Sequence, residues 1–244
     1  MNTRQSLLAI AGFLLVLNSL HAQPPPAMRK MGILSSAQPQ DSHSWKLFYQ
    51  RMREHGWIEG KHIQYAFAYA QGDFSKLPAL ASTLPADKVE VLVALNSPGA
   101  SAAIKSTCTT PIVMVEVGDS VGTGSVKSLT RPAGNVTSVT NDTGEVSGKR
   151  LEILREALSS KLPAIAIAEN EAGAGSQLSY GSAPQKQYVR GVAYVDRILR
   201  GAKPGELPIE QPTIFQFAVN LKTAKVLGIT PPPSIMVRVD KVIE

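Results

Sequence analysis

The stretch from residue 111 to residue 141 restricts the possible folds of this chain more than any other segment. It begins with a β-branched run, Pro111–Val117, which leads into a polar loop at 118–120. A short helix with Val126 and Leu129 on one face is predicted next, before a second β-rich run. A strand, a helix and a strand in this order form one unit of a parallel sheet.

The same alternation continues through the rest of the chain. Apolar or alternating runs predict strands, and apolar residues at helical spacing predict helices between them. This order predicts the α/β class with doubly wound parallel sheets. The predicted strands are 31–36, 62–70, 89–95, 111–117, 136–140, 163–168, 177–180, 213–219 and 235–239, and the other predicted helices are 45–52, 74–84, 96–105, 144–158, 185–200 and 221–227.

Composition excludes several functional classes. The chain has 244 residues, of which 43% are hydrophobic and 18% charged, as in ordinary globular proteins. Its net charge of +6 comes from scattered basic residues, which indicates a solvated surface and no nucleic-acid partner. With the single cysteine Cys108 and no Cys/His pair at ligand spacing, neither an internal disulfide nor a metal site is predicted. Common nucleotide-binding and hydrolase motifs are absent, so we do not expect an enzyme or a cofactor.

The amino terminus has the pattern of a secretory signal. Arg4 supplies a positive charge, Leu7–Leu17 is an apolar run, and Ala22 is a suitable last residue before cleavage. The run is too short to span about 30 Å of hydrocarbon as a helix. We therefore expect export to a bacterial periplasm, with a buried first helix as the alternative.

Several motifs occur in the order found in one family: GILSS at 32–36, PIVMVEVGDSVGTGSVKSLTRPAGNVTSVT at 111–140, GKRLEILREAL at 148–158 and FAVNLKTAKVLGITPPPSIMVRVDKVIE at 217–244. In this order the chain resembles proteobacterial ABC-transporter substrate-binding proteins, a group with tryptophan-binding lipoprotein-like members. The resemblance implies a class I periplasmic-binding-protein fold, with two doubly wound parallel-sheet lobes joined by three crossings. It also implies a monomer that binds a small solute, an amino acid or related carboxylate, without catalysis and delivers it to an ABC permease of the inner membrane.

The chain departs from the family after the helix at 148–158. Family members continue with several strand and helix units, whereas here 158–161 leads directly to the next strand, so roughly 60 to 90 residues are missing at about 30 per repeat. A truncated second lobe is therefore expected, either foldable or degenerate. The expected division is a signal peptide at 1–22, an N-terminal α/β lobe at 28–143, a shortened C-terminal lobe at 144–212, and a return crossing and C-terminal segment packing across both lobes at 213–244.

Polar residues near the ends of the predicted strands are the candidate ligand-binding residues, because ligands bind at the carboxyl ends of parallel strands. A helix start at Asn96 and Ser97 favours a ligand carboxylate, although both residues suit a simple helix cap. The Tyr180 side chain has two possible roles: its ring closes over a bound ligand, or it packs at the edge of the second lobe. The complete set is Ser35, Ser36, Asn96, Ser97, Glu116, Gly118, Asp119, Asn141 and Tyr180.

Two other functions remain open. An exported enzyme would use Asp119 or Glu116 as a base, but the sequence offers no obvious partner acid or nucleophile. An interaction protein would pair an exposed edge strand of the short second lobe with another chain.

Overall fold

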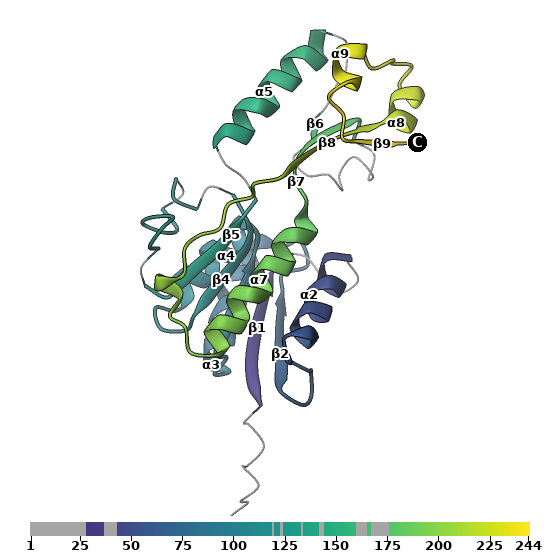
Figure 1. Ribbon diagram of the computed structural model, residues 1–244. Helices are drawn as coiled ribbons and strands as arrows, with labels where there is room; N and C mark the ends of the chain where they lie inside the picture. Colours follow the sequence, from purple (N-terminus) through teal and green to yellow (C-terminus); the bar gives the residue numbers. More distant parts are fainter. Residues whose placement is uncertain are drawn as a thin grey trace, which may run out of the picture.

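The computed structural model describes residues 28–36, 43–118, 120–122, 124–132, 134–141, 144–159, 165–166 and 176–244. These residues form two lobes, one around a five-stranded sheet and one around a four-stranded sheet (Figure 1). The predicted signal peptide and Asp119 lie outside the described residues. Within the described ranges, no helix is long and apolar enough to cross a membrane.

The first sheet has five parallel strands in the order β2-β1-β3-β4-β5, which confirms the five strands predicted for this part of the chain. Its central strands read as continuous apolar runs, and every residue of β3 is buried, as expected for a sheet covered on both faces. The strands are β1 (Arg29–Ser35), β2 (Ile63–Tyr69), β3 (Val91–Leu95), β4 (Ile112–Val117) and β5 (Val136–Thr140).

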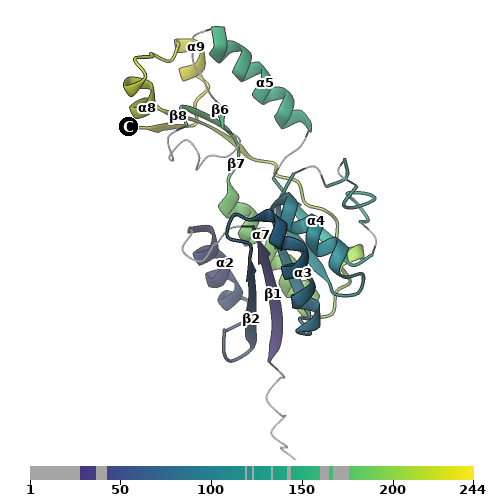
Figure 2. The ribbon, with the colours of Figure 1, turned by 180° about the vertical axis from the view of Figure 1, so that it is seen from behind.

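Helices cover both faces of this sheet. α2 (His43–Glu54) and α7 (Pro184–Leu199) pack together on one face, and α3 (Leu77–Ala86), preceded by the 3-10 turn η1 (Phe74–Lys76), lies with α4 (Asn96–Ser106) on the other (Figures 1 and 2). Alternate strand residues face opposite sides, so the sheet is doubly wound.

The second sheet is mixed, so the expectation of a parallel second sheet is wrong. Its order is β6-β7-β8-β9, and β7 and β8 are antiparallel. The reason is that β7 runs toward the junction of the lobes, whereas β8 runs away from it and pairs Phe215 with Ser182. The strands are β6 (Ile165–Ala166), β7 (Leu178–Ser182), β8 (Phe215–Asn220) and β9 (Lys241–Ile243), and the helices of this lobe are α5 (Gly144–Ser159), α8 (Leu221–Val226) and α9 (Pro233–Met236).

The structure assigns α7 to the first lobe, which corrects the expectation that 144–212 belongs to the second. The predicted apolar face of the helix is buried, but it packs on α2 and on β3, β4 and β5. The segment after η2 (Pro204–Glu206) stays on the first lobe, where Glu210 forms a bridge with Val139. Residues 213–244, expected to pack across both lobes, supply two strands of the second sheet.

Two predicted elements, the short helix around Val126 and the strand at 235–239, are not present in the structure. The described residues between 120 and 132 form turns and no helix, with a left-handed backbone at Gly124, while Val126 and Leu129 pack against the core on the α3–α4 face. The strand predicted at 235–239 is wrong, because α9 occupies its start and β9 follows. Pro233 sits in the first turn of α9, where its fixed φ favours a helix start.

The chain passes between the lobes three times. It crosses between β5 and α5, again between β7 and α7, and finally between Glu210 and β8. Both figures show these crossings between the two bodies, at the end of the first lobe where β5 terminates (Figures 1 and 2). Any change in the angle between the lobes must therefore act on these three segments.

Candidate functional site

The carboxyl ends of β1, β3 and β4 bring together four of the predicted residues. The Asn96 side chain donates from Nδ2 to Ser36 Oγ at 2.7 Å, and Gly118 donates from its backbone N–H to Ser97 Oγ at 3.4 Å. Strands in a parallel sheet end at a common edge, so residues distant in sequence meet there. We call Ser36, Asn96, Ser97 and Gly118 the edge cluster.

The edge cluster suits an anionic group. Each serine oxygen accepts a hydrogen bond, so each hydroxyl proton is free to be donated elsewhere. The cluster also lies at the start of α4, where the helix dipole favours negative charge. Asn96 Oδ1 accepts from Gly99 N–H at 3.2 Å, so Asn96 caps the helix as well, as its alternative interpretation predicts.

Two other first-lobe candidates do not join the edge cluster. Ser35 is the last residue of β1, is only 3% exposed and pairs with Tyr69 of β2. Glu116 turns toward α7, and its Oε2 accepts from the Tyr188 hydroxyl at 3.0 Å. The cause is a bulge in β4, since the register shifts between Val115 and Val117 and Glu116 has a left-handed φ of 57°.

The Glu116 carboxyl should make stability depend on pH. Burial raises the pKa of Glu116, and the hydrogen bond from Tyr188 offsets only part of the rise. A raised folded-state pKa stabilises the protein below the unfolded pKa, and this contribution is lost as pH rises through the folded value. We therefore expect Glu116→Gln to gain stability relative to wild type as pH rises, measured by urea denaturation from acidic to neutral pH. Glu206→Gln, at an exposed position, is the control, and parallel pH profiles for all three proteins would contradict the prediction.

Asn141 belongs to the junction of the lobes. Ser182 Oγ donates to the Asn141 carbonyl at 3.1 Å, and Gln187 Nε2 donates to Ser182 Oγ at 2.7 Å. This chain of bonds links the first crossing to the second. Sequence reasoning missed Ser182, at the end of β7, and Gln187, on α7, because it placed α7 in the other lobe. The local signal was a helix start directly after a strand.

Tyr180 makes its described contacts inside the second lobe. Its ring lies 6.2 Å from the rings of both Phe215 and Phe217, and its carbonyl accepts from Arg150 Nε at 2.8 Å. These contacts are those of the alternative interpretation, packing within the lobe. In the portion of the chain that the structure describes, no three His, Cys, Asp or Glu side chains are placed to hold a metal ion.

Comparison with known sequences identifies related proteins. A family model described as "ABC transporter substrate binding protein" matches residues 44–156 and 142–243. A protein of Clostridioides difficile strain R20291, named as a tyrosine-binding protein, is 34% identical over 137 residues. That match covers 56% of this chain but only 39% of the relative.

Three solved structures share the fold. A conserved domain protein from Vibrio cholerae has a TM-score of 0.76 at 20% identity, covering 88% of this chain and 100% of its own. An ABC domain from Streptococcus pneumoniae in complex with L-Trp scores 0.70 at 20% identity, with 87% and 100% coverage. A substrate-binding protein with adhesive properties from Clostridium difficile, in its ligand-free, open form, scores 0.66 at 19% identity, with 88% and 99% coverage. These likenesses confirm a fold like that of the periplasmic binding proteins.

Proposed function

Because the chain belongs to the ABC transporter substrate-binding protein family, we propose that it binds one small solute between its lobes and delivers it to a membrane permease. Proteins of this family bind substrate without transforming it. The observation that carries the proposal is the edge cluster, which gathers two hydroxyl groups and a helix start at the carboxyl edge of the first sheet. This edge lies at the end of the first lobe from which the chain crosses to the second (Figure 1).

The proposed solute is an aromatic amino acid. Its carboxylate would accept hydrogen bonds from Ser36 and Ser97 and lie at the start of α4. Two comparisons support this class, since one relative is named for tyrosine and one structure of the same fold holds L-Trp.

The sequence and the family also support a proposed cellular setting. The signal pattern in residues 1–22 supports export to the periplasm. Membership of the family supports a membrane permease as the partner and a monomer as the form that binds solute.

We also propose that the second lobe is a shortened form of the family's lobe. The direct join at 158–161 and the match of the family model in two segments, 44–156 and 142–243, support that proposal.

Thermal denaturation with amino acids tests the binding proposal. A true ligand at 100 times its Kd should raise the free energy of unfolding by about 2.7 kcal/mol. We expect L-tyrosine or L-tryptophan to raise the melting temperature, and the corresponding amino acid amide to do so far less because it lacks the carboxylate. If none of the twenty amino acids shifts the transition, the proposed function is wrong.

A matched pair of variants on α4 locates the site. Ser97→Ala removes a hydroxyl of the edge cluster and should weaken binding by about 10-fold, the equivalent of about 1.4 kcal/mol. Ser101 lies at an exposed position one turn later on α4, so Ser101→Ala should bind the amino acid as tightly as wild type does. If titration calorimetry gives both variants the same affinity for the amino acid, the edge cluster is not part of the binding site.

A further inference from the structure

The positive charge of the chain gathers on one side of the first lobe. α2 and α7, which are 12 and 16 residues long and lie side by side on the first sheet, each have a net charge of +2, whereas the whole chain has +6 (Figure 1). Their charged residues are Lys46, Arg51, Arg53 and Glu54 on α2, and Lys186, Arg190, Asp196 and Arg197 on α7. Basic residues that are scattered along the sequence therefore lie together in space.

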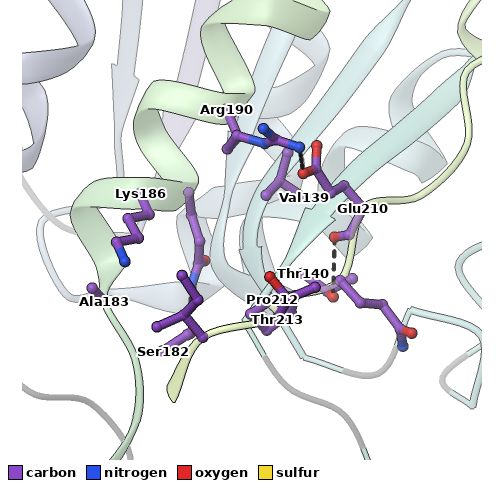
Figure 3. Close-up of a pocket in the computed structure, with 12 residues that line it drawn as sticks. Val139, Thr140, Ser182, Ala183, Lys186, Arg190, Glu210, Pro212 and Thr213 are labelled. Atoms are coloured by element: carbon purple, nitrogen blue, oxygen red, sulfur yellow. Dashed lines mark hydrogen bonds and ion pairs between the residues drawn. The ribbon is translucent and has the colours of Figure 1, made fainter. Parts of the chain in front are cut away.

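Four of these basic side chains have no acidic partner. Arg51 Nη1 lies 2.7 Å from Glu54 Oε2, and Arg190 pairs with Glu210 in the pocket at the junction of the lobes (Figure 3). Lys186 lines the same pocket but points away from that pair (Figure 3). Among the described residues, no carboxylate lies within ion-pair distance of the other four basic groups, all of which are exposed. We call these four residues the basic face: Lys46, Arg53, Lys186 and Arg197.

The two lysines of the basic face lie where they do not help their helices to fold. Lys46 is in the first turn of α2 and Lys186 is in the first turn of α7, and neither turn contains an acidic residue. The positive end of the helix dipole disfavours a cation there, whereas it favours the acidic residues that are missing. Arg53 and Arg197 are in the last turns, where the dipole favours a cation. Local stability thus explains the arginines but not the lysines, and a local rule broken without compensation is typical of a functional surface.

The spacing of the four groups fits a surface with many negative charges. Lys46 and Arg53 are seven residues apart, about 10 Å along the axis of α2, and Lys186 and Arg197 are eleven residues apart, about 16 Å along α7. Both separations are close to whole helical turns, so the two members of each pair lie on one side of their helix. A single small anion is too short to contact both members of a pair, whereas the headgroups of a bilayer present many negative charges side by side.

The basic face also lacks the apolar centre of a protein interface. In the described parts of α2 and α7, no large apolar side chain is exposed. Protein interfaces depend on aromatic and apolar side chains that become buried at their centre. Attraction to charged headgroups needs only the basic side chains, so anionic lipid is favoured here over an acidic protein.

We propose that the basic face docks reversibly on a membrane surface that is rich in anionic phospholipid. The proposal rests on the proposed function for its setting, because delivery of solute to a permease brings the protein to a membrane. Each basic residue adds only a modest attraction, so the docking is weak and falls as salt screens the charges. It would hold the protein near its permease while leaving the edge cluster, on other elements of the first lobe, available to solute.

Co-sedimentation with lipid vesicles tests the proposal. We expect the protein to sediment with vesicles of equal parts phosphatidylglycerol and phosphatidylcholine, and to stay in solution with vesicles of phosphatidylcholine alone. Lys46→Gln and Lys186→Gln should each weaken binding by about 5-fold, which corresponds to about 1 kcal/mol for one basic residue near a charged surface. Lys105→Gln is the matched control, because Lys105 is an exposed lysine on α4, which covers the opposite face of the first sheet.

A melting experiment excludes a structural role for the two lysines. Lys46→Gln and Lys186→Gln remove a cation from the first turn of a helix, so neither variant should melt below wild type. Equal binding to both kinds of vesicle, no binding to the anionic vesicles, or an equal loss in Lys105→Gln would overturn the proposal. Binding to poly-L-glutamate without binding to anionic vesicles would assign the basic face to an acidic protein and would likewise overturn it.

Two measurements distinguish this proposal from the proposed function. Lys46→Gln and Lys186→Gln should keep the wild-type affinity for aromatic amino acids, and Ser97→Ala should keep the wild-type binding to anionic vesicles. A protein that binds an aromatic amino acid but no vesicle disproves the docking alone. A protein that binds anionic vesicles but no amino acid disproves the proposed function alone.

Discussion

Replacing Gly191 with valine is expected to lower the free energy of unfolding by about 3 kcal/mol. Gly191 is buried where α7 crosses β4, and a Cβ at this position would lie 2.9 Å from Val115 Cγ2. Val115 is fully buried, and its β-branched side chain has few rotamers to retreat into. The helix must therefore move away from the sheet or the core must distort.

Gly148→Val is the matched control for this prediction. Gly148 also lies within a helix, α5, but a Cβ there would meet no atom within 4 Å. Valine and glycine differ by only a few tenths of a kcal/mol in helix propensity, so this variant should melt close to wild type. If urea denaturation shows the same stability for both variants, α7 does not pack on β4 and its assignment to the first lobe is wrong.

The second large effect is expected for Asp196→Ala, at about 3 kcal/mol. Asp196 is on α7, and its Oδ1 accepts from Trp57 Nε1 at 2.8 Å and from Arg200 Nε at 2.7 Å. His55 Nδ1 lies 3.2 Å from Oδ2, and the Arg200 guanidinium lies 5.6 Å from the centre of the Trp57 ring. Alanine would leave these donors without their acceptor and loosen the end of α7 from the segment after α2.

The effect of Asp196→Ala should depend on pH. Burial acts to raise the pKa of Asp196, but hydrogen bonds from Trp57, Arg200 and His55 outweigh it and hold the pKa below its ordinary value. The stabilisation is therefore present above the unfolded pKa of about 4 and is lost as pH falls through the lower folded value.

Thermal melts of wild type and Asp196→Ala should thus differ most near neutrality and converge in acid. Asp87→Ala is the control, because Asp87 is exposed and its only ion pair in the described residues, with Lys30, is long at 3.9 Å. Its effect should stay within about 1 kcal/mol. A constant difference between wild type and Asp196→Ala at all pH values would contradict the role given to this carboxylate.

Local sequence patterns predicted most elements of the fold. The buried run at Val91–Leu95 and the apolar stripe of Trp45, Phe48 and Met52 each bury one continuous surface, so their spacing alone predicts a strand and a helix. The cap at Asn220 was also predictable, since its Oδ1 accepts from Thr223 N–H within the same short segment. The conformation of the segment around Val126 was not predictable from its sequence. Two buried apolar residues three apart fit a helix, but they also fit a turn-rich segment that packs on the core.

The candidate site was predictable only where it follows from strand order. Parallel strands end at one edge, so the meeting of Ser36 with Asn96 and of Ser97 with Gly118 could be expected. The turn of Glu116 toward Tyr188 could not, because a bulge reverses the face to which a residue points and leaves no clear mark in composition.

The sequence by itself determined that the chain alternates strands and helices, that its first sheet is parallel, and that polar groups gather at the carboxyl edge of that sheet. Only the tertiary structure decided that α7 lies on the first lobe and that Ser182, Gln187 and Glu210 surround a pocket at the hinge. The physical reason is that an apolar stripe on a helix shows which face is buried, but not which sheet covers it. That choice depends on close approaches such as Gly191 against Val115, between residues far apart in the chain.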